Sequence, residues 1–184
     1  MKRRHFLIMS SLGLASACSS LSGGEGAPKP VLARSYDLRD LQFSAMPGLT
    51  VSESESFYPD ADIVWRGDPP GPRVAQIGAM FETAVARNRS ILQGETPVDL
   101  AVTLVRFHGI TNSTRLTVGG VYNIVFDMTV LDARNGAVLE PRRRIAANLS
   151  APGGAVGLVM RQQGQTQKVR VTDFLTGVLR QQLV

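Results

Sequence analysis

Residue types that carry nucleophilic or metal chemistry are scarce in this chain. Its 184 residues include one cysteine, Cys18, and two histidines, of which His108 lies far from the N-terminus. A zinc site needs about four ligands drawn from cysteine, histidine and carboxylate side chains, and no Gly-x-Ser-x-Gly turn marks an activated serine. We expect His108, at the end of a predicted strand, to be a partly exposed, structurally bonded imidazole. The sequence therefore predicts a protein that is not an enzyme, without a metal or cofactor.

Three carboxylates, Asp60, Asp62 and Asp68, lie close enough in sequence to suggest a calcium loop. Such a loop needs oxygen ligands at alternate positions and a glycine at a fixed place. Here Val64 stands where the third ligand belongs, and Gly67 comes one place late. We therefore expect these aspartates to form turns and caps.

Two other features supply candidate interaction residues. Trp65 is the only tryptophan; it is either part of the core or, because its neighbours are polar, a contact near the surface. Arg142, Arg143 and Arg144 form the one concentrated run of charge. They are either solvated residues that protect an edge strand from aggregation, or contacts to anionic lipid headgroups or an acidic partner.

The N-terminus has the order of an export signal. Basic residues come first, an uncharged apolar run over 6–14 is next, and small residues end at Ala17, directly before Cys18. The apolar run is far shorter than the ~20 residues that span a bilayer as a helix. This order predicts a cleavable signal peptide over 1–17.

Residues 14–18, Leu-Ala-Ser-Ala-Cys, resemble the lipobox of bacterial lipoproteins, in which the cysteine thiol receives diacylglycerol before cleavage. Ala15 departs from the family pattern, which usually has leucine there, and the same residues also fit an ordinary signal peptidase site. Both alternatives cut before Cys18. A lone thiol is a liability in an oxidising compartment unless it is modified. The resemblance thus implies a covalent lipid on Cys18, with palmitate among its acyl chains.

The export route is suggested by a second resemblance. Arg3, Arg4, Phe6 and Leu7 match the twin-arginine signal, in which two arginines are followed by Phe-Leu after one intervening residue. The flanking positions depart from that pattern, since Lys2 replaces a serine or threonine and Ile8 replaces a lysine. The alternative is a general secretory signal that happens to contain two arginines.

Composition constrains the part of the chain after the signal. The formal charge of +5 falls to +2 when the signal removes three basic residues and no acidic one. This balance gives no basic face of the kind that binds nucleic acid. Residues 18–31, rich in serine, glycine and proline, predict a flexible lipidated tether. Residues 32–184 are enough for a single domain.

Apolar periodicity predicts strands and helices in that domain. The first strand slips in its alternation near Asp40, which suggests a bulge. Gly71-Pro72 opens a helix that ends at Gly94, and Asn135-Gly136 is a strong hairpin signal. The predicted strands are 35–44, 49–53, 98–104, 122–130 and 137–149, and the last helix is 166–183. The resulting order of strand, helix, three strands and helix predicts an α+β domain with an antiparallel sheet covered on one face by two helices.

Residues 58–68 and 106–109 resemble a poorly characterised family of bacterial lipoproteins with a domain of unknown function. The predicted architecture is similar to that of auxiliary lipoproteins of ABC-type lipid transport. These resemblances imply a periplasm-facing accessory or adaptor subunit that is lipid-anchored to the outer or cytoplasmic membrane and has an envelope protein partner. The alternative is a periplasmic small-molecule or lipid-binding module, which would need a closed apolar cavity between sheet and helices.

Overall fold

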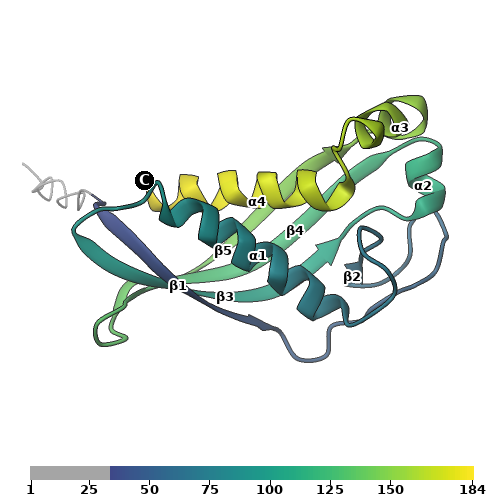
Figure 1. Cartoon of the computed structure of the whole chain (residues 1–184). Coiled ribbons are helices and arrows are strands. Elements are labelled where there is room, and N and C mark those ends of the chain that lie inside the picture. Colours follow the sequence, from purple (N-terminus) through teal and green to yellow (C-terminus); the bar gives the residue numbers. More distant parts are fainter. Residues whose placement is uncertain (1–33) are drawn as a thin grey trace, which may run out of the picture. The chain divides into compact units, whose positions relative to one another are not determined.

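The computed structural model of the protein describes residues 34–184, which form one sheet with helices packed against it (Figure 1). The predicted signal peptide over 1–17, the tether over 18–31 and its lipidation site Cys18 lie outside the described residues. The same holds for the predicted export residues, Arg3, Arg4, Phe6 and Leu7. Within 34–184, no helix combines the length and the apolar character that crossing a membrane requires.

The sheet has four long strands in the order β1-β3-β4-β5. Their bounds are Tyr36–Ala45 for β1, Thr96–His108 for β3, Gly120–Asp132 for β4 and Val138–Ala151 for β5. A fifth strand of two residues, β2 (Ile63–Val64), pairs with the end of β3 beyond the reach of β1. Strand β5 is therefore one edge of the sheet, and β1 with β2 is the other.

The sheet is mixed, which corrects the prediction of a purely antiparallel one. The pairs β3 with β4 and β4 with β5 are antiparallel as predicted, but β1 and β2 both run parallel to β3. The helix α1 (Arg73–Arg89) connects β1 to β3 across one face of the sheet and returns the chain to the end where β1 began. A crossover of this kind joins parallel strands.

Two long helices cover one face of the sheet, as predicted (Figure 1). α1 packs along α4 (Gln167–Leu183); α1 also contacts β1, and α4 contacts β5. Their apolar residues and those of the covered sheet face form one core, including Leu38, Ile77, Phe81, Leu100, Ile124, Phe126, Leu175 and Leu179. Residues 34–184 thus hold a complete core and fold as a unit on their own.

Two local predictions are confirmed and one is wrong. The β1–β3 register shifts between Leu38 and Asp40, where the alternation slips. Gly136 takes a positive φ of 74° in the β4–β5 turn. The predicted strand over 49–53 forms only a single bridge, between Val51 and Ile63, because the chain there pairs with a two-residue strand.

Two short helices, α2 (Asn112–Leu116) and α3 (Gly154–Gln162), pack together at one end of the sheet, here called the α2–α3 end (Figure 1). The segment before β4 and the segment after β5 lie very close together there, since a Cβ on Gly153 would overlap the backbone nitrogen of Gly119. Only glycine permits this approach. Backbone contact therefore sets the place of α3, none of whose residues is buried.

Candidate functional site

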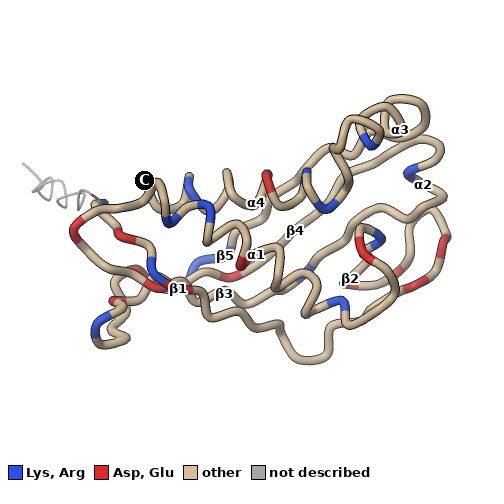
Figure 2. The backbone as a smooth tube through the Cα atoms, in the orientation of Figure 1, with Lys and Arg blue, Asp and Glu red and all other residues tan. Residues whose placement is uncertain are grey.

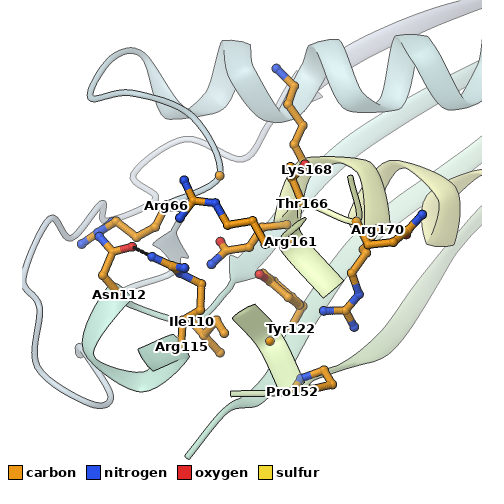
Figure 3. Close-up of a pocket in the computed structure, with 14 residues that line it drawn as sticks. Arg66, Ile110, Asn112, Arg115, Tyr122, Pro152, Arg161, Thr166, Lys168 and Arg170 are labelled. Atoms are coloured by element: carbon orange, nitrogen blue, oxygen red, sulfur yellow. Dashed lines mark hydrogen bonds between the residues drawn. The ribbon is translucent and has the colours of Figure 1, made fainter. Parts of the chain in front are cut away.

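A basic pocket of about 310 Å³ opens at the α2–α3 end (Figure 3). Its walls come from segments that are far apart in sequence, namely the turn before α1, α2, the start of β4, α3 and the start of α4. Its cationic residues are Arg66, Arg115, Arg161, Lys168 and Arg170. No aspartate, glutamate, histidine or cysteine is among the residues that line it.

Two of these cations are neutralised by carboxylates outside the pocket. Arg66 forms ion pairs with Glu55 at 2.8 Å and Glu53 at 3.3 Å. Lys168 extends away from the pocket to Asp68, with 2.7 Å between its Nζ and the carboxylate. Their charge is therefore already compensated.

The other three cations, Arg115, Arg161 and Arg170, form no ion pair with any carboxylate in residues 34–184. Arg115 donates to the side-chain oxygen of Asn112 at 3.0 Å, and Arg170 to the backbone oxygen of Ser150 at 2.5 Å. Figure 2 shows basic positions and no acidic one along α2 and α3. The pocket consequently has an uncompensated positive charge.

Tyr122 lies at the centre of the pocket wall and is fully buried. Its hydroxyl group, which points into the pocket, has no hydrogen-bond partner (Figure 3). Burial raises the pKa of Tyr122, although the charges of Arg170 and Arg115 act in the opposite direction. The phenol thus stays a neutral donor. Leaving such a group unpaired costs about 1–3 kcal/mol, which a ligand that accepts its hydrogen bond would recover.

The first turn of α4 forms another wall. Thr166 caps this helix by accepting from the backbone N–H of Val169 at 3.3 Å, and the first turn has no acidic residue. The side-chain amide of Gln167 is buried there, and neither of its polar atoms has a partner. The positive end of a helix dipole favours an anion, so it acts in the same direction as the three arginines.

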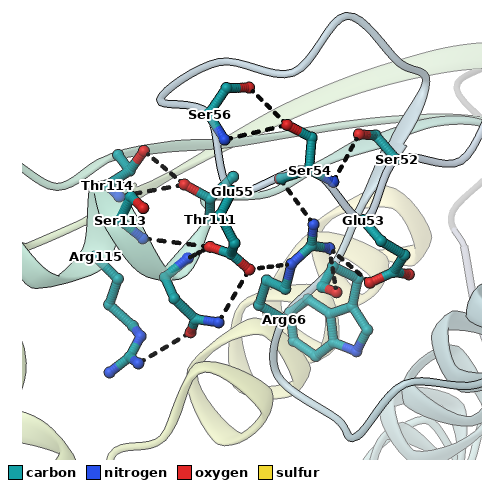
Figure 4. A network of polar contacts seen from close by, with 12 residues as sticks. Ser52, Glu53, Ser54, Glu55, Ser56, Arg66, Thr111, Ser113, Thr114 and Arg115 are labelled. Atoms are coloured by element: carbon teal, nitrogen blue, oxygen red, sulfur yellow. Dashed lines mark hydrogen bonds and ion pairs between the residues drawn. The ribbon is translucent and has the colours of Figure 1, made fainter.

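A loop of alternating serine and glutamate, residues 52–56, holds α2 in place (Figure 4). The carboxylate of Glu55 accepts from the backbone N–H groups of Asn112 and Ser113, at 2.8 and 3.4 Å, and pairs with Arg66. These bonds satisfy free N–H groups at the start of the helix. Glu55 therefore positions the α2 wall of the pocket and neutralises Arg66 by forming an ion pair with it.

Trp65 belongs to the core and not to the surface. Its side chain is fully buried, its ring packs over Gly67, and its Nε1 donates to Asp68 at 2.8 Å. Of the two alternatives for Trp65, the structure places it in the first. Asp68 also accepts a hydrogen bond from Lys168, so it links Trp65 to α4.

The run Arg142, Arg143 and Arg144 lies on the edge strand β5. Arg142 and Arg144 both pair with Asp127, which is buried beneath them on the sheet face away from the helices. Arg143 pairs with Glu140. Glu140 also pairs with Arg34, so each arginine of the run has a carboxylate partner but the two carboxylates only partly neutralise the run.

His108 is the last residue of β3, as predicted, but it is 3% exposed and not partly exposed. Its ring stacks on Tyr58 with 4.3 Å between centroids because the loop before β2 folds over the end of β3. The imidazole Nδ1 lies 3.0 Å from the backbone oxygen of Ala61, and Nε2 is buried without a partner. Arg106 lies 3.2 Å from the same Nδ1 and donates to the Tyr58 hydroxyl, so the ring is held between the loop and the strand.

The predicted turn role fits Asp62, whereas Asp68 joins two side chains. Asp62 accepts from the backbone N–H and the hydroxyl of Thr50, at 2.9 and 2.8 Å. Asp68 accepts from Trp65 and Lys168. Residues 34–184 contain no group of three or more potential metal ligands.

Sequence reasoning missed the residues of the basic pocket. Its three unpaired arginines, Arg115, Arg161 and Arg170, are isolated in the sequence. The alternation pattern identified Tyr122 only as an inward-facing residue of a strand. One signal was present: residues 100–126 and 141–172 contain no aspartate or glutamate, so their basic residues have no local partner.

Comparison of the sequence with protein families gives one match, over residues 36–184, to the family of unknown function DUF6778. The chain belongs to the DUF6778 family. The expectation of a domain of unknown function is therefore confirmed, although the family supplies no activity or site residues. No curated protein matches this DUF6778 sequence.

Two crystal structures share a weak likeness with this DUF6778 protein. One is an inferred lipoprotein from Caulobacter crescentus CB15, with 14% identity, a TM-score of 0.28, and coverage of 82% of this chain and 91% of the other. The second is a Xanthomonas campestris protein of family DUF330, with 17% identity, a TM-score of 0.41, and coverage of 84% and 93%. Likenesses at these scores support no conclusion about function.

Proposed function

We propose that this DUF6778 protein is a lipid-anchored binding protein of the cell envelope that faces the periplasm and takes an anionic group in its basic pocket. One observation supports this most directly. A buried hydroxyl without a partner, that of Tyr122, lies among three arginines that no carboxylate in the described chain neutralises. Such an arrangement is costly in the free protein and favourable once an anion is bound.

Phosphate is the anion that fits these donors best. Guanidinium groups form paired hydrogen bonds to phosphate oxygens, and a neutral phenol and a helix N-terminus add further donors. The pocket volume of about 310 Å³ is at the lower end of the usual range for ligand sites. A small phosphate-bearing group suits this space.

The pocket supports binding and not catalysis. Its lining offers no carboxylate, imidazole or thiol that could act as a general base or nucleophile. Tyr122 stays protonated because burial raises its pKa. A non-enzymatic accessory role stays our proposal, and the basic pocket is the ligand site that we propose for it.

The binding-module alternative takes a different form from the one expected. Apolar side chains from α1, α4 and the sheet fill the space where a closed apolar cavity was expected. The basic pocket is instead an open site at the end of these layers. We therefore propose that the protein binds a charged group, which it delivers to an envelope partner or receives from one.

Titration of inorganic phosphate into residues 34–184 by isothermal calorimetry tests this function. We expect saturable binding that Arg161→Gln weakens at least about tenfold, the effect of losing one charge-assisted bond. Arg142→Gln is the matched control, because that arginine is paired and lies outside the pocket. Absence of phosphate binding, or equal loss in both variants, would overturn the proposal.

The anchor is tested separately on the full chain in a bacterial host. Two acyl chains hold a protein stably on a membrane, whereas one holds it only marginally. We expect the protein in the membrane fraction with a lipid mass on Cys18, and Cys18→Ala to be soluble or uncleaved. An unlipidated parent in the soluble periplasmic fraction contradicts the anchor. Replacing Arg3 and Arg4 by lysine should stall the precursor if the twin-arginine route is used.

A further inference from the structure

Exposed apolar side chains gather at the α2–α3 end. In α3, Val156, Leu158 and Val159 are 60%, 52% and 50% exposed. Residues on and after α2 and in the adjacent loop extend the same surface. Together these side chains form what we call the α2–α3 surface: Phe57, Tyr58, Leu116, Val118, Val121, Val156, Leu158 and Val159. A concentration of exposed apolar residues of this kind marks an interaction site.

The exposure of α3 is built into the fold. A nine-residue helix without buried side chains has little intrinsic stability. Here the backbone of Gly153 approaches Val118 and Gly119, and that of Gly157 approaches the carbonyl of Pro152, so closely that side chains would not fit. The helix is therefore held from behind by its backbone, and its apolar side chains are directed outward.

The charge on α2 and α3 is of one sign, and Glu55, which lies against the start of α2, is paired with Arg66. Residues 109–126, which contain α2, and residues 141–172, which contain α3, include basic residues and no carboxylate. Arg115 lies in the last turn of α2 and Arg161 in the last turn of α3, and both line the basic pocket. Apolar residues interspersed with uncompensated arginines complement an anionic lipid surface, where apolar side chains enter the acyl boundary and arginines meet phosphates.

We propose that the α2–α3 surface docks on a membrane that contains anionic lipid, and that the basic pocket takes the phosphate of one lipid headgroup. The identity of the ligand rests on the proposed function, whereas the membrane contact rests on the exposed apolar residues. Gly157 and Arg161 line the pocket while Val156, Leu158 and Val159 lie outside it, so α3 forms the border between the two.

The predicted anchor is compatible with this contact. The described residues begin at Arg34, just before β1. This end of the sheet is opposite to the end at which α2 and α3 lie (Figure 1). The sixteen residues from Cys18 to position 33 can span at most about 55 Å, while β3 and the three residues by which β4 extends beyond it span about 53 Å. The α2–α3 end can thus reach the membrane in which Cys18 is anchored.

Co-sedimentation with vesicles tests the contact on residues 34–184, which lack the anchor. We expect at least about tenfold more protein on vesicles containing phosphatidylglycerol than on phosphatidylcholine alone. The triple variant Val156→Ser, Leu158→Ser, Val159→Ser should lose this binding and still titrate inorganic phosphate as the parent does. The control variant Ile91→Ser, Val138→Ser changes apolar residues of similar exposure, 54% and 61%, far from α3 and should sediment like the parent.

Each outcome has a distinct meaning. A parent that binds phosphate but no anionic vesicle overturns the membrane contact and leaves the proposed function intact. A triple variant that sediments like the parent also overturns it, and its circular dichroism spectrum shows whether the fold is retained. A parent that binds vesicles but not phosphate overturns the pocket ligand alone. Dimers of the parent that the triple variant abolishes, without vesicle binding, would make α3 an interface between copies.

Discussion

Two groups of three arginines differ in what surrounds them. Arg142, Arg143 and Arg144 are consecutive on β5, and each pairs with a carboxylate, Asp127 or Glu140. Three arginines of the basic pocket, Arg115, Arg161 and Arg170, come from separate segments and pair with no carboxylate in residues 34–184. A dense run of charge in the sequence therefore does not show that the charge is free to bind a partner, because a neighbouring strand can supply the counter-ions.

The physical consequence is a division of roles. Asp127 is buried beneath two guanidinium groups, which donate hydrogen bonds to both of its carboxylate oxygens. That cluster joins β4 to β5 and contributes stability. The pocket arginines repel one another and leave polar groups unpaired, so they cost stability and favour a ligand.

The largest expected effect comes from removing the pocket charges. The triple variant Arg115→Gln, Arg161→Gln, Arg170→Gln should lower phosphate affinity at least about 100-fold, since each bond to a charged group contributes about 1.5–3 kcal/mol. Its melting temperature should stay equal or rise as repulsion is relieved. Calorimetric titration and thermal unfolding measure both, and the same substitutions at Arg142, Arg143 and Arg144 should leave affinity unchanged. Equal affinity losses in the two variants would contradict the distinction between paired and unpaired arginines.

The next effect concerns the paired group. Asp127→Asn should lower the free energy of unfolding by about 1–3 kcal/mol, because Arg142 and Arg144 lose their shared carboxylate. Phosphate binding should not change, since Asp127 is not part of the pocket. Urea unfolding gives the free energy. A stability equal to that of the parent would show that the pairs are no more than solvated surface contacts.

A smaller effect separates binding from stability within the pocket. Tyr122→Phe removes a buried hydroxyl without a partner, so the free energy of unfolding should stay unchanged or rise by up to about 1 kcal/mol. Phosphate affinity should fall about tenfold, the equivalent of one hydrogen bond to an anion. Loss of stability with full affinity would mean that the hydroxyl has an unrecognised partner in the protein.

The smallest effect is a dependence on pH. Hydrogen bonds from Arg144, followed by those from Arg142, outweigh the desolvation of Asp127 and hold its pKa below the ordinary value. A carboxylate with a lowered folded-state pKa contributes stability that is present above its unfolded pKa of about 3.9 and is lost as pH falls through the folded value. Acid unfolding followed by circular dichroism should therefore show a weaker pH dependence below about pH 4 in Asp127→Asn. Identical acid profiles would contradict the assignment.

Local signals predicted much of the fold. Helical spacing located α1 and α4, alternation located β3, β4 and β5, and the slip at Asp40 marked a real register shift. These features depend on neighbours within a few residues, which a sequence displays directly. The class α+β, the two helices on one face and the hairpin at Gly136 follow from them.

Contacts between distant segments decided the rest. No local pattern names the partners in the parallel pairing of β1 with β3, in the burial of Trp65 and His108, or in the pairing of Arg142 and Arg144 with Asp127. The basic pocket is the clearest case, because Tyr122 and its three unpaired arginines come together only when β4, α2, α3 and α4 are packed. The sequence by itself determined the long strands and helices, and the export and lipidation signals stay predictions. Only the tertiary structure decided which charges are cancelled and which remain free to bind.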